Sequence, residues 1–377
     1  MKEPLVAMII TNLNGASIGY ENDSVLNLCL KTLKNTNYHN YKVIVGDDHS
    51  TDNSREVVKK AFPYADFVAN KASNRLLEST NEMRMFRSFS INNGAASNYS
   101  RGASKDKGKG IFRSFSTNNN TAIRYAFKKY HPDYIVILNN DVVFTDKNWL
   151  SHMVKIAESD EKIGIVSPKL LWPDGRVQSF IMRFGDRFSL RNLGRGDAGK
   201  NDYNSIREVE VMAGVALLVK RTVLEKIGLL DENYLSSYED VDFCLRTRAK
   251  GFKIIYDAKA KVVHLAGFTR KLVRNDADMI HIINYANQRN RFYFLRKHKD
   301  KCGFGTRMMW YLLYFGDGVF DMHSKSGEVG LRYIKLQSHP IRRFYLTLKA
   351  FSDSRKLIPK DDSTLIKQAN KKHLTKQ

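Results

Sequence analysis

Apolar runs alternate with segments of helical periodicity from the start of the chain. Short, nearly continuous apolar runs, typical of buried strands, occupy residues 5–11, 41–45, 66–69 and 134–138. Apolar side chains at helical spacing occupy residues 25–33, 52–62 and 121–130. This alternation predicts an α/β fold in which helices flank a mostly parallel sheet, with ligands bound at the carboxyl ends of the strands.

The pattern is less regular after residue 144. Strand-like segments follow at residues 163–168, 209–212, 216–219, 253–256 and 262–265, and a helix is predicted at 241–249. We expect this half of the chain to extend the same sheet and to hold a second substrate.

A nine-residue segment occurs twice between the third strand and the next helix. Residues 85–93 recur as 111–119 with seven of nine positions identical at an offset of 26. Two copies are too few for a solenoid, and residues 94–110 between them are rich in Gly, Ser and Lys. We interpret the second copy as the structural one and residues 75–117, approximately, as a flexible insertion. The alternative is a lid over a bound substrate.

The charge of the chain is strongly positive and unevenly distributed. The 377 residues carry a formal charge of +23, and residues 265–377 alone contain 23 Lys and Arg against 9 Asp and Glu. Such a surface favours phosphate-bearing substrates, anionic lipid headgroups or nucleic acid. The length allows two domains, or one domain with a substantial extension.

Cysteine usage and hydropathy indicate the cytoplasm. The three cysteines form neither a CxxC pair nor an even-numbered framework, which favours reduced thiols. No secretion signal is visible at the N-terminus, and the apolar stretch at residues 308–320 is too short to span a bilayer. We therefore expect a cytoplasmic protein whose contact with a membrane, where it has one, is peripheral.

Two groups of acids are candidates for catalysis. The apolar run 134–138 ends at Asn139-Asn140-Asp141, which places one carboxylate where a buried strand reaches the surface. Residues 239–242 contain three acids in four positions. If the two groups meet in space, they suggest a metal site that faces a general base. Taken alone, Asp141 also fits a turn or helix cap.

The second acidic group has a structural alternative as well. Ser236 and Glu239 have the spacing of a capping box at the start of a helix. That leaves Asp240 and Asp242, which point in different directions around the helix, so that one of them could face a cleft. His264, at the end of a strand-like segment, is the best placed histidine to add a nitrogen ligand, although an ordinary core or surface histidine is the alternative.

Five segments in order carry a family resemblance. They are Val43-Ile-Val-Gly-Asp-Asp-His-Ser-Thr-Asp-Asn-Ser54, Ile137-Leu-Asn-Asn-Asp-Val-Val143, Val211-Met-Ala-Gly-Val-Ala-Leu-Leu-Val-Lys-Arg221, Gly228-Leu-Leu-Asp-Glu232 and Tyr238-Glu-Asp-Val-Asp-Phe-Cys-Leu-Arg246. They resemble the motifs of family 2 glycosyltransferases, inverting enzymes with the Rossmann-like GT-A fold, and most closely the rhamnosyltransferase-like branch. The resemblance covers about residues 4–298.

The resemblance implies a donor site for a nucleoside-diphosphate sugar. It places Thr11 and Asn14 in the loop at the nucleotide, and Asp47 at the N3 proton of a pyrimidine, as in a UDP- or dTDP-linked donor. Asp141 would lie at the diphosphate as the last acid of a DxD-type motif. Asn139 stands where the full motif has its first Asp, so one metal-binding carboxylate is missing.

The resemblance also implies a metal, a base and a mechanism. Asp141 and His264 would bind a divalent cation, Mg²⁺ or Mn²⁺, and Asp240, in the pair with Glu239, would be the catalytic base. The reaction would be a single in-line displacement with inversion. Residues 288–292 approach the QxxRW element of processive synthases, but Phe292 replaces Trp and no spanning helix is visible, so we expect a single addition.

The predicted organisation has three parts. Residues 1–145 form a donor half and 146–298 an acceptor half of one GT-A domain, and 299–377 form a basic extension with interleaved aromatics. The resemblance implies a glycan or polyprenyl-linked acceptor. The extension suits an anionic membrane surface, and a solvated basic face with ordinary core aromatics is the alternative. A sugar nucleotidyltransferase is the nearest alternative, but residues 12–15 lack its glycine-rich basic loop. A nucleic-acid-binding protein is the other, and the chain has no reader motif.

Overall fold

One mixed sheet runs through the protein. The computed structural model describes residues 3–70, 115–178, 181–184, 190–193, 203–234, 237–265, 277–301, 303–321, 335–336, 340–359, 363 and 366. Within them a nine-stranded sheet has the order β11-β14-β8-β13-β6-β1-β4-β5, and β7 pairs with β14. The strands are β1 (Val6–Asn12), β4 (Tyr41–Asp47), β5 (Asp66–Ala69), β6 (Tyr134–Asn139), β7 (Val142–Val143), β8 (Ile163–Leu171), β11 (Arg207–Val209), β13 (Ala216–Lys220) and β14 (Lys253–His264).

The four strands predicted in the first half, β1, β4, β5 and β6, are parallel to one another, as predicted, whereas the short β7 pairs antiparallel with β14. β1 lies between β4 and β6, and β5 extends the sheet beyond β4. The second half is mixed, because β13 inserts antiparallel between β6 and β8. The segments predicted at 253–256 and 262–265 form one strand, β14, which shifts register between Asp257 and Lys261. The segment predicted at 209–212 is divided between β11 and the short strand β12 (Val211–Met212).

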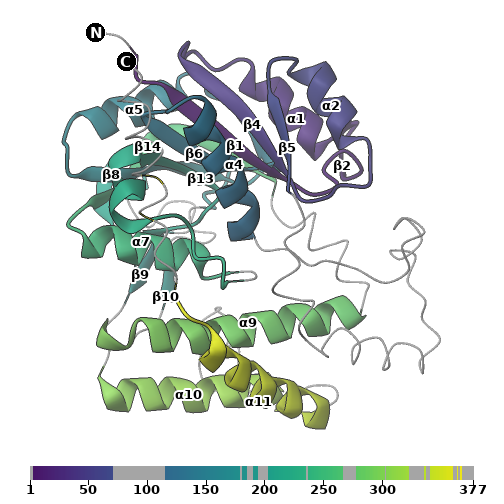
Figure 1. The fold of residues 1–377 in the computed structure, drawn as a ribbon, viewed down its shortest axis with the longest axis vertical. Coiled ribbons are helices and arrows are strands. Elements are labelled where there is room, and N and C mark those ends of the chain that lie inside the picture. The colour runs from purple at the N-terminus through teal and green to yellow at the C-terminus, as the bar shows by residue number, and fades with distance from the viewer. Residues whose placement is uncertain are drawn as a thin grey trace.

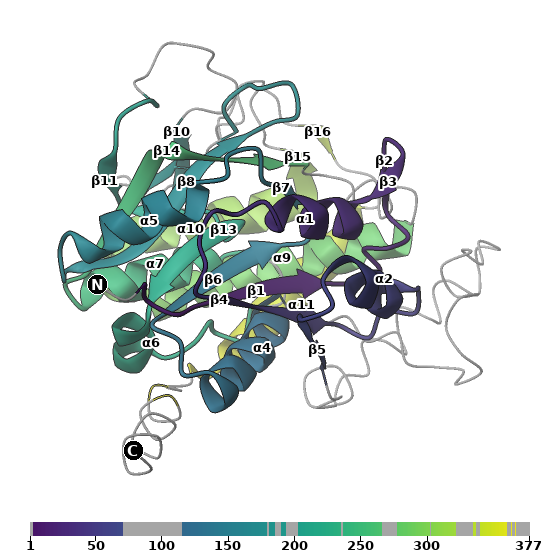
Figure 2. The ribbon, with the colours of Figure 1, turned by 90° about the horizontal axis from the view of Figure 1, so that it is seen from above.

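Alternate residues of the central strands face two separate layers of helices (Figures 1 and 2). Val6, Met8 and Ile10 of β1 belong to the core shared with α1 (Val25–Leu33), α2 (Ser54–Ala61) and α5 (Trp149–Glu158). Ala7 and Ile9 belong to the opposite core, which includes α4 (Phe115–Lys129), α6 (Arg221–Ile227) and α7 (Glu239–Ala249). The near-continuous apolar runs therefore reflect burial on both faces.

The helix after the duplicated segment begins earlier than predicted. α4 starts at Phe115, inside the second copy, rather than at residue 121. Its polar first turns are buried because Asn118 donates to the Gly46 oxygen at 2.9 Å and Asn120 to the Leu230 oxygen at 2.8 Å. The structural role predicted for the second copy is thus confirmed for residues 115–119. The first copy and most of the predicted insertion lie outside the described residues.

Three further helices lie side by side below the sheet (Figure 1). They are α9 (Ala277–Lys297), α10 (Phe304–Val319) and α11 (Pro340–Lys356). Trp310, Tyr314 and Ala350 of α10 and α11 are buried in the same core as α4 and α7. None of the helices in the described ranges is long and apolar enough to cross a membrane. The remaining short elements are β2 (Gly19–Tyr20), β3 (Asp23–Ser24), β9 (Ile181–Phe184), β10 (Leu190–Leu193), β15 (Phe320–Asp321), β16 (Lys335–Leu336) and a 3₁₀ turn (Lys299–Lys301).

Candidate active site

The carboxyl ends of β4, β1 and β6 gather the residues predicted to bind the donor. Thr11 pairs with Asn139 across β1 and β6, and Asn12 pairs with Asp47 across β1 and β4. A chain of amides crosses this edge: Asn140 Nδ2 donates to Asn12 Oδ1, and Asn12 Nδ2 donates to Asp47 Oδ1, each at 2.8 Å. The three strand ends are thus joined by side chains as well as by the sheet.

Asp47 organises the loop that follows β4. Its Oδ1 accepts from the Ser50 hydroxyl at 2.6 Å, and its Oδ2 accepts from the Ser50 backbone nitrogen at 2.9 Å. Asn14 has a left-handed backbone, φ 49°, and its side-chain oxygen accepts from the Thr51 nitrogen at 2.8 Å. The loops after β1 and β4 therefore brace one another beside the strand ends.

Asp141 meets His264 at the neighbouring end of β14. Asp141 Oδ1 lies 3.2 Å from His264 Nε2, and both side chains are largely buried. Gln178 Nε2 donates to the backbone oxygen of His264 at 3.3 Å, which turns Gln178 Oε1 toward His264 Nδ1 at 2.7 Å. Because that oxygen can only accept, Nδ1 carries a proton. The other ring nitrogen, Nε2, faces Asp141 Oδ1.

This arrangement fits a divalent cation. Asp141 Oδ1 has no hydrogen-bond partner among the described residues, and two electron-pair donors at 3.2 Å repel unless a proton or cation lies beside them. A histidine held by an outer hydrogen bond at its second nitrogen is typical of metal sites. No cluster of three or more His, Cys, Asp or Glu suited to a metal occurs in the described ranges, so Asp141 and His264 are a two-residue set.

The catalytic candidates Glu239 and Asp240 open helix α7. The helix begins at Glu239, and the preceding Tyr238 has a left-handed backbone, φ 74°, without a side-chain cap. Glu239 is therefore the first helical residue and not the third, so the predicted capping box does not form. Ser236 itself lies outside the described residues. The acids of this turn are left available for another role.

Hydrogen bonding distinguishes the carboxyl groups of Glu239 and Asp240, although burial raises the pKa of both. Burial raises the pKa of Glu239, and the neighbouring Asp240 charge raises it further. Burial also raises the pKa of Asp240, but backbone N–H groups of Gly214 at 3.0 Å and Val241 at 2.8 Å donate to its two oxygens and oppose this. Glu239 Oε2 has no such donor in the described part of the chain. Asp240 is therefore the first of the pair to ionise.

The two acidic groups meet through one short piece of backbone. Gly214 donates to Asp240, and the next residue, Val215, accepts a hydrogen bond from the backbone nitrogen of Asn139 at 3.0 Å. β13 then starts at Ala216, which pairs with Leu138. The base candidate and the end of β6 therefore lie at the same edge of the sheet.

A comparison with known protein families now becomes decisive. A family model described as "Glycosyltransferase like family 2" matches residues 4–291, a span that includes every candidate residue above. The chain belongs to this glycosyltransferase family. The α/β sheet and its flanking helices are the GT-A fold of family 2.

Individual relatives of this family 2 protein are distant. The O-antigen biosynthesis protein RfbC of Myxococcus xanthus is 27% identical over 153 residues, which is 39% of this chain and 12% of RfbC. Rhamnosyltransferase WbbL of Escherichia coli K12 is 26% identical over 160 residues, 38% of this chain and 58% of WbbL. The chain thus covers less than two thirds of either relative. The solved mannosyltransferase PcManGT of Pyrobaculum calidifontis, in complex with GDP-Man and Mn²⁺, aligns over 99% of this chain and 81% of its own, at 13% identity and a TM-score of 0.45.

The third acid of the family motif, Asp242, has a structural place. It is fully buried, and it contacts Arg246 Nε at 2.8 Å, Lys297 Nζ at 2.7 Å and His298 Nε2 at 2.9 Å. Burial alone would raise its pKa, but Arg246, His298 and Lys297 hold it well below the usual range. Of the two acids left open by the sequence, Asp240 is therefore the candidate base and Asp242 is not.

Sequence reasoning missed two residues of this family 2 site. Gly214 donates to the candidate base and leaves little space, since an added Cβ would lie 3.3 Å from Asp240 Cβ. The sequence marks this glycine only through the motif 211–221, which by itself assigns the glycine no role. Gln178 fixes the orientation of His264 across 86 residues of sequence, and no local pattern marks it.

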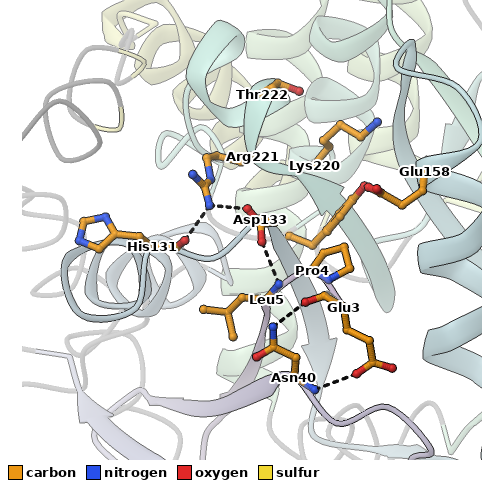
Figure 3. Close-up of a pocket in the computed structure, with 11 residues that line it drawn as sticks. Glu3, Pro4, Leu5, Asn40, His131, Asp133, Glu158, Lys220, Arg221 and Thr222 are labelled. Atoms are coloured by element: carbon orange, nitrogen blue, oxygen red, sulfur yellow. Dashed lines mark hydrogen bonds and ion pairs between the residues drawn. The ribbon is translucent and has the colours of Figure 1, made fainter. Parts of the chain in front are cut away.

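A separate pocket of about 740 Å³ lies at the opposite edge of the sheet (Figure 3). Leu5 and Tyr134 line it, which places it at the start of β1 and β6. Its charged groups are engaged within the protein: Arg221 pairs with Asp133 at 2.7 Å, and Lys220 donates to the Ala157 oxygen at 2.9 Å. This pocket is therefore not part of the candidate glycosyltransferase site.

Proposed function

We propose that the protein transfers a hexose or deoxyhexose from a nucleoside-diphosphate sugar to a hydroxyl group, with inversion and by single addition. The observation that supports this most is the link from Asp240 through Gly214 and Val215 to Asn139, which joins a base to the diphosphate end of the sheet. A nucleotidyltransferase or a nucleic-acid-binding protein would not need this joined pair of acidic groups.

The donor lies, in this proposal, across the ends of β4, β1 and β6. Thr11, Asn14 and Asp47 contact the nucleoside of a UDP- or dTDP-linked sugar, and Asn139 and Asp141 lie at the diphosphate. The Asp47 carboxylate already accepts from Asn12 and from Ser50. A carboxylate with two oxygens offers about four acceptor sites, which leaves room for a pyrimidine N3 proton.

Asp141 and His264 hold Mg²⁺ or Mn²⁺ in this proposal. The fit depends on the oxygen and nitrogen donors that face each other at 3.2 Å. When bound there, such a cation would supply positive charge to stabilise the departing nucleoside diphosphate. Asn139 contributes an amide where a carboxylate would add charge, so the protein supplies one carboxylate and one imidazole.

Asp240 removes the proton of the acceptor hydroxyl, while the oxygen of that hydroxyl attacks the anomeric carbon of the donor sugar. The N–H groups of Gly214 and Val241 favour the ionised form of this carboxylate and orient it. Glu239 retains its proton to a higher pH, because desolvation and the neighbouring Asp240 charge raise its pKa.

The similarity to RfbC and WbbL supports a glycan or polyprenyl-linked acceptor in cell-surface polysaccharide or glycoprotein glycan synthesis.

A donor panel tests this function. Purified protein is incubated with UDP- and dTDP-linked hexoses and deoxyhexoses, a glycan or polyprenyl-phosphate acceptor and Mn²⁺, and nucleoside diphosphate release is measured. We expect release with at least one donor, its loss in EDTA and its recovery when Mn²⁺ is restored. Mn²⁺ binding in the presence of UDP or dTDP should weaken in His264→Leu. In a parallel incubation with UTP or dTTP and a sugar 1-phosphate, release of pyrophosphate would instead identify a nucleotidyltransferase.

We also propose that the protein is cytoplasmic and contacts the anionic face of a membrane through the extension 299–377. This extension contains 16 Lys and Arg against 7 Asp and Glu. Large apolar side chains at spacings of three and four face solvent on its two helices: Phe304, Met308, Met309 and Leu312 of α10, and Ile341, Phe344, Tyr345 and Leu348 of α11. Exposed apolar stripes combined with basic charge suit an interface rich in anionic lipid.

Flotation with vesicles tests this contact. We expect the protein to float with phosphatidylglycerol vesicles and not with phosphatidylcholine vesicles, and to lose several-fold of this binding in the double variant Leu312→Gln/Phe344→Gln. Point variants are preferable to truncation because α10 and α11 share the core of the remaining protein. Tyr64→Gln, which changes an exposed aromatic of the donor half, is the matched control. Equal flotation of both variants would contradict this contact.

A further inference from the structure

Helix α9 carries two rows of side chains that face the segment containing the candidate base. One row is Arg289, Tyr293 and Lys297, and the other is Asn290, Phe294 and His298. Each row has a spacing of four residues, so its members lie above one another on the helix. The first row contacts residues 231–233, with Lys297 also in contact with Asp242, and the second contacts residues 237–242.

The first row holds the aspartate of the segment 228–232. Tyr293 donates its hydroxyl to Asp231 Oδ2 at 2.7 Å, and Lys297 Nζ lies 2.6 Å from the same oxygen. Arg289 donates to the backbone oxygen of Asn233. The loop before the catalytic pair is therefore attached to α9 by charged and neutral hydrogen bonds.

The second row contacts residues on both sides of Glu239 and Asp240. Asn290 Nδ2 donates to the Ser237 oxygen at 3.1 Å, and the rings of Phe294 and Tyr238 lie 5.1 Å apart. His298 Nε2 lies 2.9 Å from Asp242 Oδ1 on the other side of the pair. Contacts from one helix thus precede and follow the two acids directly.

The backbone is strained at the two residues before Glu239. Ser237 and Tyr238 have φ angles of 67° and 74°, a left-handed conformation that residues with side chains rarely adopt. Consecutive residues of this kind persist only where surrounding contacts hold them. α7 has no side-chain cap that would supply such a contact, and Asn290 and Phe294 do.

We propose that Asn290, Phe294 and His298 are positioning residues for the proposed glycosyl transfer. They hold residues 237–242 in the strained turn and fix the rotation of α7, which directs Asp240 to the Gly214 N–H group. They act through that segment. The inference rests on the proposed function for its kinetic effect, whereas the positioning itself is a property of the fold.

Kinetics and hydrogen exchange test the positioning. Asn290→Leu removes the hydrogen bond to Ser237 and a longer one that Arg289 donates at 3.4 Å, and His298→Leu removes the contact with Asp242. His298→Gln restores a donor toward Asp242. Tyr285→Phe is the matched control, because it removes a hydrogen bond from α9 to Asp353 at 2.7 Å, away from the segment. We expect kcat to fall about 10- to 100-fold in the two Leu variants with little change in the donor KM, and to recover partly in His298→Gln.

Exchange at the amides of residues 238–241 gives a readout that does not depend on activity. It should accelerate in Asn290→Leu and stay at the wild-type rate in Tyr285→Phe. Unchanged kcat in Asn290→Leu, or a fall that only follows the loss of folded protein, would overturn the inference. If the wild type transfers no sugar, the proposed function fails, and the exchange rates alone then decide the positioning: equal rates in Asn290→Leu and wild type refute it.

Discussion

Asp240→Asn is expected to lower kcat for sugar transfer by about 10²–10⁴-fold, the usual contribution of a general base. The amide has a single acceptor oxygen, so it can keep only one of the two hydrogen bonds that the Gly214 and Val241 N–H groups donate to separate carboxylate oxygens. It cannot take a proton from the acceptor hydroxyl. The donor KM should change little, because the donor residues lie on β1, β4 and β6.

The pH dependence gives a second measure of the same base. Because burial raises the pKa of Asp240, transfer by the wild type should decline as the pH falls through a value above that of an ordinary Asp. This acidic limb should be absent from the residual activity of Asp240→Asn. Glu239→Gln is the control, and it should retain more activity than Asp240→Asn. The opposite ranking would assign the base to Glu239.

The donor half shows how far hydrophobic periodicity alone determines the fold. The predicted helix 25–33 and strand 66–69 match α1 and β5 at both ends. These elements are short, regular and bounded by polar residues, so local pattern suffices. The candidate site follows from the same logic, since parallel strands bring Thr11, Asp47 and Asn139 to one edge.

The rest depends on contacts between distant residues. β13 is buried on both faces, and a strand buried in this way has a continuous apolar pattern in either direction. The hydrophobic pattern therefore does not predict that β13 runs antiparallel to β6. The first turns of α4 read as a loop because they are rich in Asn and Ser. Their burial depends on Gly46 and Leu230, which lie 72 and 110 residues away. Local propensity is overridden in such places by tertiary hydrogen bonds.

Helix α7 also has a feature that only contacts between distant residues explain. Asp240 and Asp242 belong to one acidic group in the sequence, and both are embedded in protein in the structure. Backbone N–H groups orient Asp240 at the sheet edge, whereas Asp242 is joined to the end of α9. The motif therefore combines the proposed base with an anchor, and only the partners of each acid distinguish the two.

Asp242→Ala is expected to destabilise the protein by about 3–5 kcal/mol, the range found when one partner of a buried ion pair is removed. The substitution leaves Lys297 and Arg246 without the carboxylate that they contact at 2.7 and 2.8 Å. Lys297 keeps its contact with Asp231, so the remaining cost falls mainly on Arg246 and His298. The free energy of unfolding in urea measures the loss.

Lys253→Met is the matched control for a surface pair. Lys253 and Asp160 also lie 2.7 Å apart, but both are partly exposed to solvent, so the expected cost is much smaller than for Asp242→Ala. The pH dependence separates charge from packing. Since the folded-state pKa of Asp242 is depressed, its contribution is complete above its unfolded value of about 3.9 and is lost as the pH falls toward the folded value. The difference between wild type and Asp242→Ala should therefore shrink below about pH 4. A difference that stays constant through this range would attribute the loss to packing rather than to the charge of the anchor.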